Sequence, residues 1–259
     1  MIALISQIQF LENINVTKIF DSLTHPTIDG KWLNPKFNEF SSLEYLLKSM
    51  EKNNIYKGFA VGMKNVGGYT HQAYIEFLKP YPNLIPIAYC EEVEELGIIK
   101  SLGYLGIKIH PRLSNIQPDD DIVFDIIKEA NKLGLVVLYC GFLGATNKFV
   151  EKIEQEKLIF LHTGGKDIKE TFNLLKGKKN VLLDLSYTIC KYPELDSFII
   201  ELFTKFYDKI CVGSDHPEVS HKSLRERFEF FSNNLEEEAK NRIAYENIEE
   251  FMGRTLCST

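Results

Sequence analysis

The chain has 259 residues, a hydrophobic fraction of 44% and a formal net charge of −6. This length is typical of one domain, and the composition is that of a globular protein with a large core. The mild negative charge and the lack of a long basic run argue against nucleic acid as a partner.

No apolar run approaches the roughly 18 residues that a membrane-spanning helix needs. The first residues also lack the basic segment and small-residue cleavage site of a signal peptide. We therefore expect a cytoplasmic protein that has no membrane partner and forms a single domain over residues 1–259. The cysteines are widely separated, without CxxC spacing, which predicts reduced thiols and not a disulfide framework; they are Cys90, Cys140, Cys190, Cys211 and Cys257.

Short apolar runs rich in Ile, Val, Leu, Phe and Tyr recur along the chain, and they read as strands buried on both faces of a parallel sheet. The runs are Val16–Asp21, Lys57–Gly62, Leu84–Tyr89, Gly106–His110, Leu135–Cys140, Leu158–His162, Asn180–Ser186 and Lys209–Gly213. Amphipathic stretches with capping residues lie between them and predict helices. These are Ser42–Asn53, Asp120–Leu133, Lys166–Lys176, Pro193–Phe206 and Ser223–Asn233, followed by Leu235–Ile243 and Glu246–Gly253 near the end.

Alternation of eight strands with helices predicts βαβ units that close into an α/β (β/α)8 TIM barrel with C-terminal helices. An open doubly wound sheet is the alternative, but no GxGxxG follows the first strand, so its dinucleotide-binding form has no support. The first fifteen residues form a short N-terminal extension, which we expect to add a strand or hairpin over the barrel floor.

Polar residues end several of these strands, in the segments FDSLTHP, GIKIHP, FLHTGG, LDLS and VGSDHP. In a parallel barrel these ends meet on one rim, where active sites are built. Strand alternation places Lys108 with His110 on one face, and Asp184 with Ser186. By the same rule Asp21, Leu23 and His25 share a face. Converging His, Lys and Asp side chains are what metal binding or acid–base chemistry requires.

Each of these residues also has a purely structural explanation. Lys108 could pair with Asp184, Asp215 could cap a helix, and Asp184 could orient a neighbour. His216 could line the pocket, because it follows Asp215 directly. The other candidates read as structural: His71 as a surface residue, His221 as a solvated loop residue and Cys140 as a small buried residue.

The segments FDSLTHP, GIKIHP, FLHTGG, NVLLDLSY, VGSDHP and ENIEEFMG, in this order, resemble landmarks of the amidohydrolase superfamily. The nearest branch is the amidohydrolase-related group of metal-dependent hydrolases and decarboxylases, and the resemblance covers about residues 17–253. It implies a (β/α)8 barrel that holds one or two divalent metals, often zinc. The metal would activate water or polarise a substrate, and a strand 8 aspartate would handle a proton.

The resemblance assigns His25, His162 and Asp215 as metal ligands, with Asp215 and His162 also catalytic. Two family ligands are replaced, because Leu23 stands where the first histidine of strand 1 belongs and Tyr139 where the strand 5 histidine belongs. Leucine cannot bind zinc, and a neutral tyrosine binds it poorly. His110 or Cys140 could help to complete the site. The residues that we expect to bind substrate are Lys108, His110, Arg112, Tyr139, Asp184 and His216.

Three hypotheses follow. The first is a hydrolase or C–C lyase that uses a divalent metal, zinc by preference, on a small anionic substrate. The second is a metal-free enzyme of the same fold, and the third is a non-catalytic metabolite-binding relative that has lost its metal ligands. We expect a small-molecule substrate as the partner, with a homodimer possible.

Overall fold

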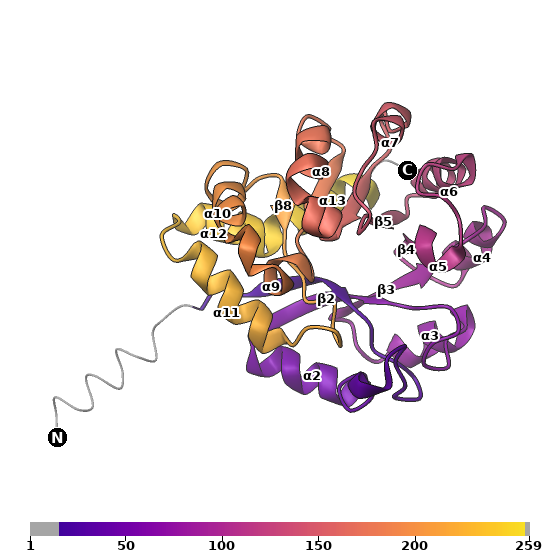
Figure 1. Cartoon of the computed structure of the whole chain (residues 1–259). Helices are drawn as coiled ribbons and strands as arrows, with labels where there is room; N and C mark the ends of the chain where they lie inside the picture. Colours follow the sequence, from indigo (N-terminus) through magenta and orange to yellow (C-terminus); the bar gives the residue numbers. More distant parts are fainter. Residues whose placement is uncertain (1–15, 257–259) are drawn as a thin grey trace, which may run out of the picture.

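The computed structural model describes residues 16–256, which form eight parallel strands alternating with helices. The strands follow one another in chain order around a single sheet, and the helices form a ring outside it (Figure 1). The predicted (β/α)8 barrel is confirmed. The strands are β1 (Ile19–Thr24), β2 (Ile55–Val61), β3 (Leu84–Tyr89), β4 (Gly106–Ile109), β5 (Val136–Cys140), β6 (Leu158–Leu161), β7 (Val181–Asp184) and β8 (Ile210–Cys211).

Backbone hydrogen bonds close the barrel between its first and last strands. The Ser22 amide donates to the Val212 carbonyl at 3.2 Å, and the Asp215 amide donates to the Leu23 carbonyl at 2.9 Å. The His25 amide then donates to the carbonyl of His216 at 2.8 Å. Because these bonds continue past the end of β8, they hold the segment around Asp215 against the segment around His25.

The helices that cover the barrel match the predicted ones to within three residues at each end, and the structure adds α3, α4, α5, α7 and α9. The long ones are α2 (Leu43–Lys52), α3 (His71–Leu78), α4 (Glu95–Ser101), α6 (Asp121–Lys132), α8 (Ile168–Leu175), α10 (Asp196–Lys205), α11 (His221–Ser232) and α13 (Asn247–Leu256). The short ones are η1 (Pro35–Phe37), α5 (Pro111–Ser114), α7 (Asn147–Lys152), η2 (His162–Asp167), α9 (Thr188–Lys191), η3 (Pro193–Leu195), α12 (Glu237–Asn241) and η4 (Arg242–Glu246).

Helix α2 shows why the sequence forms these elements. The Ser42 hydroxyl accepts a hydrogen bond from the Tyr45 amide and so caps the first turn. Leu43, Leu46 and Met50 then fall on one face and are buried against the barrel. Among residues 16–256, no helix is both long and apolar enough to cross a membrane.

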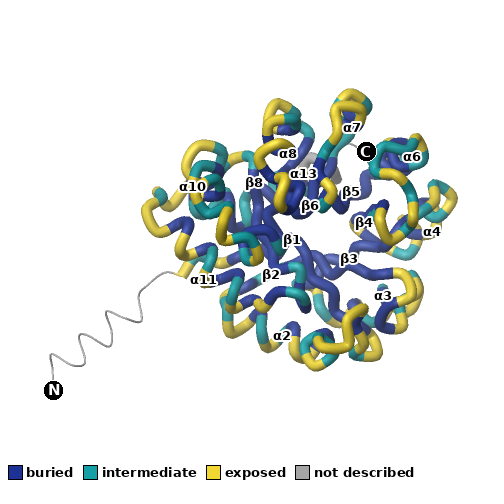
Figure 2. Tube along the Cα trace, in the orientation of Figure 1, coloured by how far each residue is buried: buried dark blue, intermediate teal, exposed yellow. Residues whose placement is uncertain are grey.

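Apolar side chains pack against both faces of the strands. One cluster lies between the barrel and its helices, and another lies inside the barrel. Figure 2 shows the strands as the buried centre, with exposure confined to the outer helices and loops. Ile248 and Phe251 of α13 belong to the inner cluster, where they pack with Phe20 and Leu182. Helix α13 therefore covers the barrel floor. The strand or hairpin that we expected there from residues 1–15 lies outside the described residues.

Strand β1 departs from the predicted alternation. It begins at Ile19, and one extra residue enters it between Asp21, which pairs with Gly58, and Thr24, which pairs with Ala60. Such a bulge turns the following side chains to the opposite face. Leu23 therefore packs inside the barrel, whereas the Asp21 carboxylate meets His221 of α11. The prediction that Asp21 shares a face with Leu23 and His25 is wrong for this reason.

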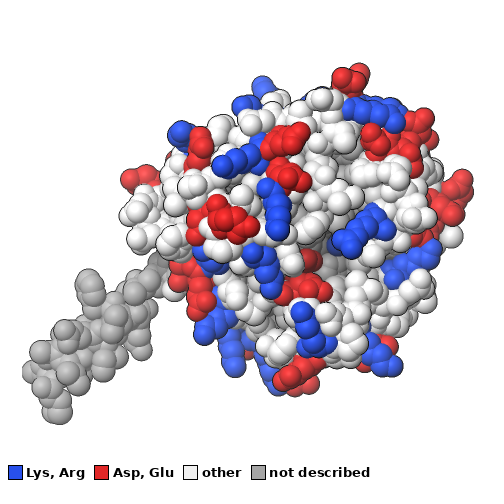
Figure 3. All heavy atoms as spheres, in the orientation of Figure 1, with Lys and Arg blue, Asp and Glu red and all other residues white. Residues whose placement is uncertain are grey.

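Charged side chains of both signs are spread over the face seen in Figure 3, without a large patch of one sign. This distribution agrees with the modest net charge of −6. It favours a small ligand in a cavity over an extended charged partner.

Candidate active site at the barrel mouth

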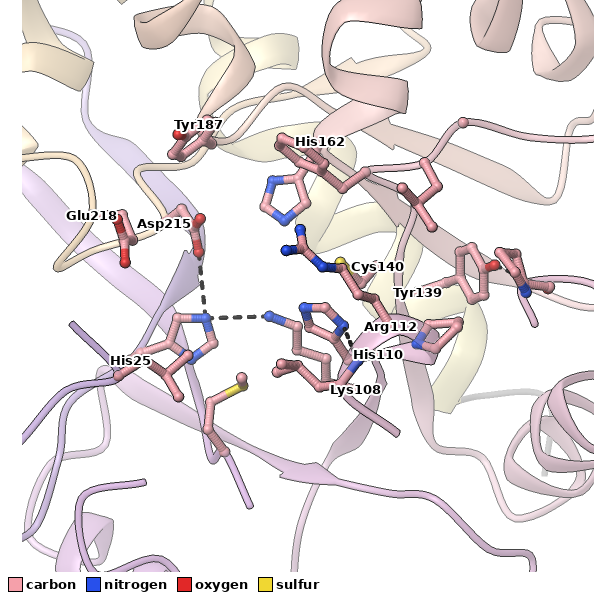
Figure 4. A pocket seen from close by; sticks show the side chains of 18 of the residues that line it. His25, Lys108, His110, Arg112, Tyr139, Cys140, His162, Tyr187, Asp215 and Glu218 are labelled. Atoms are coloured by element: carbon pink, nitrogen blue, oxygen red, sulfur yellow. Dashed lines mark hydrogen bonds and ion pairs between the residues drawn. The ribbon is translucent and has the colours of Figure 1, made fainter. Parts of the chain in front are cut away.

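A cavity of about 350 Å³ lies where the C-terminal ends of the strands meet. This is the end of a (β/α)8 barrel where loops and strand ends build active sites. Its polar lining includes most of the predicted residues, and Figure 4 shows their side chains converging on it. These are His25, Lys108, His110, Arg112, His162 and Asp215.

His25 lies at the centre of the polar group and is 2% exposed. Its Nδ1 lies 2.8 Å from the Val61 carbonyl, which can only accept, so Nδ1 carries the proton in the neutral ring. Nε2 is then the acceptor and lies 3.3 Å from Nζ of Lys108. Burial and the Lys108 charge lower the pKa of His25. The imidazole is therefore neutral, and Trp32 packs tilted against it with ring centroids 5.0 Å apart.

Lys108 reaches this point because β4 alternates as the sequence predicts. Ile107 and Ile109 pack in the outer cluster, so the Lys108 side chain turns inward, where it is 2% exposed. Its ammonium has three N–H donors, of which one meets His25. No carboxylate in the described part of the chain forms an ion pair with it, so donors remain for an anionic ligand.

Asp215 faces His25 from the segment after β8, with Oδ1 3.4 Å from His25 Nε2. Burial raises the pKa of this carboxyl, but its close contact with His25 and the charges of the nearby His162 and Lys108 outweigh burial and lower it. The carboxylate is thus ionised at neutral pH. Its backbone has φ of 62°, a left-handed conformation that few residues other than glycine adopt.

His162 follows β6 and is held from below by a chain of hydrogen bonds. Its Nδ1 lies 3.1 Å from the Ser186 carbonyl and 3.2 Å from the Ser186 hydroxyl. That hydroxyl donates to Asp184, so Nδ1 must be the donor to Ser186. Burial lowers the pKa of His162, but Cys140 and Asp215 outweigh burial and raise it to about 9. Nε2 is left to act in the cavity.

At the end of β5, the side chain that points into the barrel belongs to the residue one position after the predicted one. Tyr139 points out of the barrel, where its ring packs in the outer cluster beside Phe149 and Phe160. Its hydroxyl donates to the Pro118 carbonyl at 3.0 Å, and Figure 4 shows it at the edge of the polar group. The inward residue at this strand end is Cys140, which lines the cavity together with His110 and His162. The expectation that Tyr139 occupies the strand 5 ligand position is therefore wrong, although Tyr139 is among the residues that line the cavity.

For Cys140 the sequence indicated a small buried residue, or one that helps to complete a metal site. Burial raises the pKa of its thiol, but contact with His110 and His162 outweighs burial and lowers the pKa well below the ordinary value. The one signal available was strand parity, because Val136, Leu138 and Cys140 alternate inward.

Two predicted substrate residues, Asp184 and His216, lie away from the cavity. Asp184 is 0% exposed inside the barrel and accepts hydrogen bonds from the hydroxyls of Ser22 and Ser186 and from the His162 amide. It orients its neighbours and cannot reach a substrate. His216 turns outward, with Nε2 2.8 Å from the Phe40 carbonyl. Both expectations fail because buried partners already hold these side chains.

His221 is likewise not the solvated residue that its polar segment indicated. It is 0% exposed, and its Nε2 lies 3.1 Å from Oδ2 of Asp21. Its Nδ1 is 2.9 Å from the Ser49 hydroxyl. It stacks on His216 with ring centroids 4.9 Å apart. This group joins α11 to β1 behind the site.

The cavity also has walls that no sequence motif marked. Trp32, Phe142 and Tyr187 line it, together with Glu218, which accepts a hydrogen bond from the Trp32 indole at 2.8 Å. The Phe142 ring packs edge-on against both His162 and Tyr187. These residues come from loops, where no periodicity indicates which side chains turn inward.

The donor arrangement does not fit a divalent metal. Within residues 16–256, no three His, Cys, Asp or Glu side chains are grouped so that they could hold an ion. Leu23 is packed among apolar residues, and the Lys108 ammonium occupies the Nε2 side of His25. A positive charge at this position repels a second cation. The metal site expected at His25, His162 and Asp215 therefore stays a prediction without a donor set to support it, and we derive no step through a metal.

No family model matches the sequence, and no curated protein sequence matches it. Solved structures are similar in fold. An uncharacterised TIM-barrel protein from Bordetella bronchiseptica is 17% identical with a TM-score of 0.77, and the match covers 92% of this chain and 99% of that one.

Two of the similar structures belong to proteins whose names state an activity. A probable 2-pyrone-4,6-dicarboxylic acid hydrolase from Acinetobacter baumannii, with citric acid bound, is 16% identical with a TM-score of 0.67 over 91% of this chain and 99% of that chain. A dihydroxybenzoic acid decarboxylase from Polaromonas, with bound manganese and 2-nitroresorcinol, is 11% identical with a TM-score of 0.71 over 92% and 97%. At these identities the likeness shows the fold alone: this chain has the (β/α)8 barrel of these proteins.

Proposed function

We propose that this chain is an amidohydrolase-related enzyme that hydrolyses, or cleaves a C–C bond in, a small anionic substrate at the barrel mouth. One observation carries the proposal. The carboxylate of Asp215 and the cations of Lys108 and Arg112 line the same cavity. Among the described residues neither cation forms an ion pair with a carboxylate, so both can receive an anionic substrate. The Lys108 charge is buried, and a buried charge is costly unless it serves a ligand.

Backbone strain supports a functional role for the rim. His162, Tyr187 and Asp215 have φ of 63°, 61° and 62°, and all three line the cavity. Left-handed conformations of such residues cost about 1–3 kcal/mol each and cluster at active sites. A fold that accepts this cost at three lining residues favours an enzyme over a relative that has lost its site.

The acid–base chemistry would fall to Asp215 and His162. Asp215 is ionised and can accept a proton, whereas His162 carries one at neutral pH and can donate it. Such a pair can deprotonate water and protonate a leaving group, which contributes typically 10²–10⁴-fold in rate. The Lys108 ammonium supplies a fixed positive charge for the developing oxyanion. These roles need no metal, which favours the metal-free form of the enzyme.

The shape of the cavity favours a flat substrate. Trp32, Phe142 and Tyr187 provide ring faces and edges, against which a planar ring packs well. Arg112 lies at the rim, where its guanidinium fork matches a carboxylate. The proposed substrate class is therefore a ring compound that carries one or two carboxylates. The two enzymes named above, whose names refer to a pyrone dicarboxylic acid and a dihydroxybenzoic acid, agree with this class.

Incubation with a panel of carboxylate-bearing lactones, cyclic amides and hydroxybenzoates tests the proposal. Product masses distinguish hydrolysis, which adds water, from decarboxylation, which removes CO₂. Turnover should disappear in Asp215→Asn and persist in Asp125→Asn, an exposed aspartate on α6. Tight binding of a panel member without turnover would instead favour the non-catalytic relative.

A further inference from the structure

The thiol at the end of β5 is the chemical group in the cavity that the acid–base scheme leaves unused. Cys140 is 8% exposed and lines the cavity beside Lys108, His110 and His162. Both imidazoles are close enough to lower the pKa of its thiol. In Figure 4 its sulfur is drawn between the two rings, facing the interior of the group. A thiol held between two imidazoles at the bottom of a ligand cavity is the arrangement of a nucleophile and its base.

The two imidazoles have different hydrogen-bonding roles. His162 donates from Nδ1 to Ser186, so the neutral ring has its lone pair on Nε2. In His110 the two ring nitrogens have the opposite roles. Its Nδ1 accepts a hydrogen bond from the Leu113 amide at 3.3 Å, so its Nε2 carries the hydrogen. One ring can therefore take the thiol proton, and the other can donate to a negatively charged sulfur or oxygen.

We propose that Cys140 is a covalent nucleophile of this site, which attacks the acyl carbon of an ester, lactone or amide substrate and forms a thioester. The inference rests on the proposed function and selects its hydrolytic form, because decarboxylation needs no acyl intermediate. The Ser186 and Asp184 side chains act as positioning residues, since they hold His162 with Nε2 free.

The reaction balances as follows. The proton of the Cys140 thiol already lies on Nε2 of His162, so the sulfur attacks as a thiolate and forms a bond to the acyl carbon, and the carbonyl oxygen becomes an oxyanion beside Lys108 and His110. When the oxyanion collapses, the acyl C–O or C–N bond breaks, and the leaving group takes the proton from His162. Water then loses a proton to Asp215 and attacks the thioester carbon. The C–S bond breaks, and the proton that Asp215 took from water passes to the released sulfur and His162. One ester or amide and one water have then given an acid and an alcohol or amine.

An activated ester tests this step without knowledge of the natural substrate. The full-length protein is mixed with p-nitrophenyl acetate, release of p-nitrophenolate is followed in the first turnover, and acid-quenched protein is digested and mapped by mass. The expected result is a burst of about one equivalent per chain and an acetyl group on the peptide that contains Cys140. Cys140→Ala should abolish both, and Cys190→Ala, which removes a half-buried thiol of α9 outside the cavity, should change neither.

A second variant separates the two half-reactions. Asp215→Asn should keep the burst and the acetyl group on Cys140 but slow the later turnover, because Asp215 acts on water and not on the thiol. His162→Gln should slow the burst itself by about 10²-fold or more. Since the burst is measured in the wild-type protein, the proposal does not depend on any variant folding.

The proposal is overturned if the wild-type protein shows no burst and no acetyl group on Cys140, or if Cys140→Ala keeps the burst. It is also overturned if Cys140→Ala turns over a substrate from the panel at the wild-type rate, in which case the proposed function still stands. Failure of the proposed function appears differently, as acetylation of Cys140 with no turnover of any carboxylate-bearing compound.

Discussion

The ammonium of Lys108 lies 3.3 Å from Nε2 of His25, at the side of the imidazole that faces the cavity. Since Nδ1 of His25 is committed to the Val61 carbonyl, Nε2 is the nitrogen free to meet a cation. A protein side chain therefore supplies the positive charge beside His25. This contact links the electrostatics of the site to its chemistry, and its consequences can be measured.

Replacement of Lys108 by methionine removes the charge and keeps a side chain of similar length. The pKa of His25 should then rise toward 6.5, because the Lys108 charge is, after burial, the main influence that lowers it. NMR titration of the His25 ring protons measures this shift. Affinity for an anionic ligand should fall about tenfold or more, by analogy with charge-assisted hydrogen bonds worth roughly 1.5–3 kcal/mol. Lys128→Met, on the exposed face of α6, should change neither quantity, and an unchanged His25 pKa in Lys108→Met would contradict the assigned contact.

Asp215→Asn should lower turnover by about 10²–10⁴-fold while the fold is kept. Asparagine tolerates the left-handed backbone at this position, where φ is 62°, so the melting temperature should change little. Steady-state kinetics and thermal unfolding of the same preparation measure the two effects. A variant that melts normally and retains full turnover would remove Asp215 from the chemistry.

The protonation of His162 predicts a loss of activity at alkaline pH. Its pKa is raised to about 9, with burial opposed by Cys140 and Asp215, so the donor form disappears as the pH rises through 9. The same shift stabilises the fold by an amount that is complete below the ordinary pKa of 6.5 and is lost as the pH rises through about 9. NMR titration of His162 checks the value. In Cys140→Ala the pKa should be lower, and a value near 6.5 in the wild-type protein would contradict the contact with the thiol.

Chelator treatment should leave the protein unchanged. Because no group of three donors in residues 16–256 is placed to hold an ion, we expect dialysis against EDTA to alter neither the melting temperature nor the turnover. Elemental analysis after mild purification should give well under one divalent ion per chain. A stoichiometric metal whose removal abolishes turnover would restore the metal-dependent hypothesis.

His221 should matter for stability and not for catalysis. It is buried against Asp21 and Ser49, whereas Asp21 keeps its bonds from the amide and hydroxyl of Ser214. His221→Ala should therefore cost about 1–3 kcal/mol of unfolding free energy, which is roughly 2–10 °C in melting temperature at this chain length. Lys222→Ala, the exposed neighbour on α11, serves as the control. An unchanged melting temperature in His221→Ala would show that the buried pair contributes nothing.

The fold could be predicted from the sequence because the patterns that indicate its strands and helices are local. Buried parallel strands appear as apolar runs, helices appear as amphipathic stretches, and eight repeats of this pair close into a barrel. The same logic gathered His25, Lys108, His162 and Asp215, since parallel strands bring their C-terminal ends to one rim. The alternation of β4 also placed Lys108 correctly inside.

Side-chain direction at the strand ends required the tertiary structure. A one-residue shift in parity decides whether the side chain of Tyr139 or that of Cys140 points into the barrel, and the sequence pattern alone does not show it. The bulge in β1 has the same effect. Asp21 and Leu23 are two residues apart and would share a face in a regular strand, but the bulge turns their side chains to opposite faces. Local periodicity carries no information about either displacement.

The sequence by itself determined the barrel, the rim and the residue types gathered there. Only the tertiary structure decided which polar groups are committed to the protein and which are left for a ligand. Asp184, His216 and His221 have buried partners distant in sequence, and none of the three lines the cavity. Lys108, Cys140 and Asp215 face the cavity. The physical reason is that satisfaction of a buried polar group depends on neighbours brought by the fold, and a residue's position in the chain does not specify them.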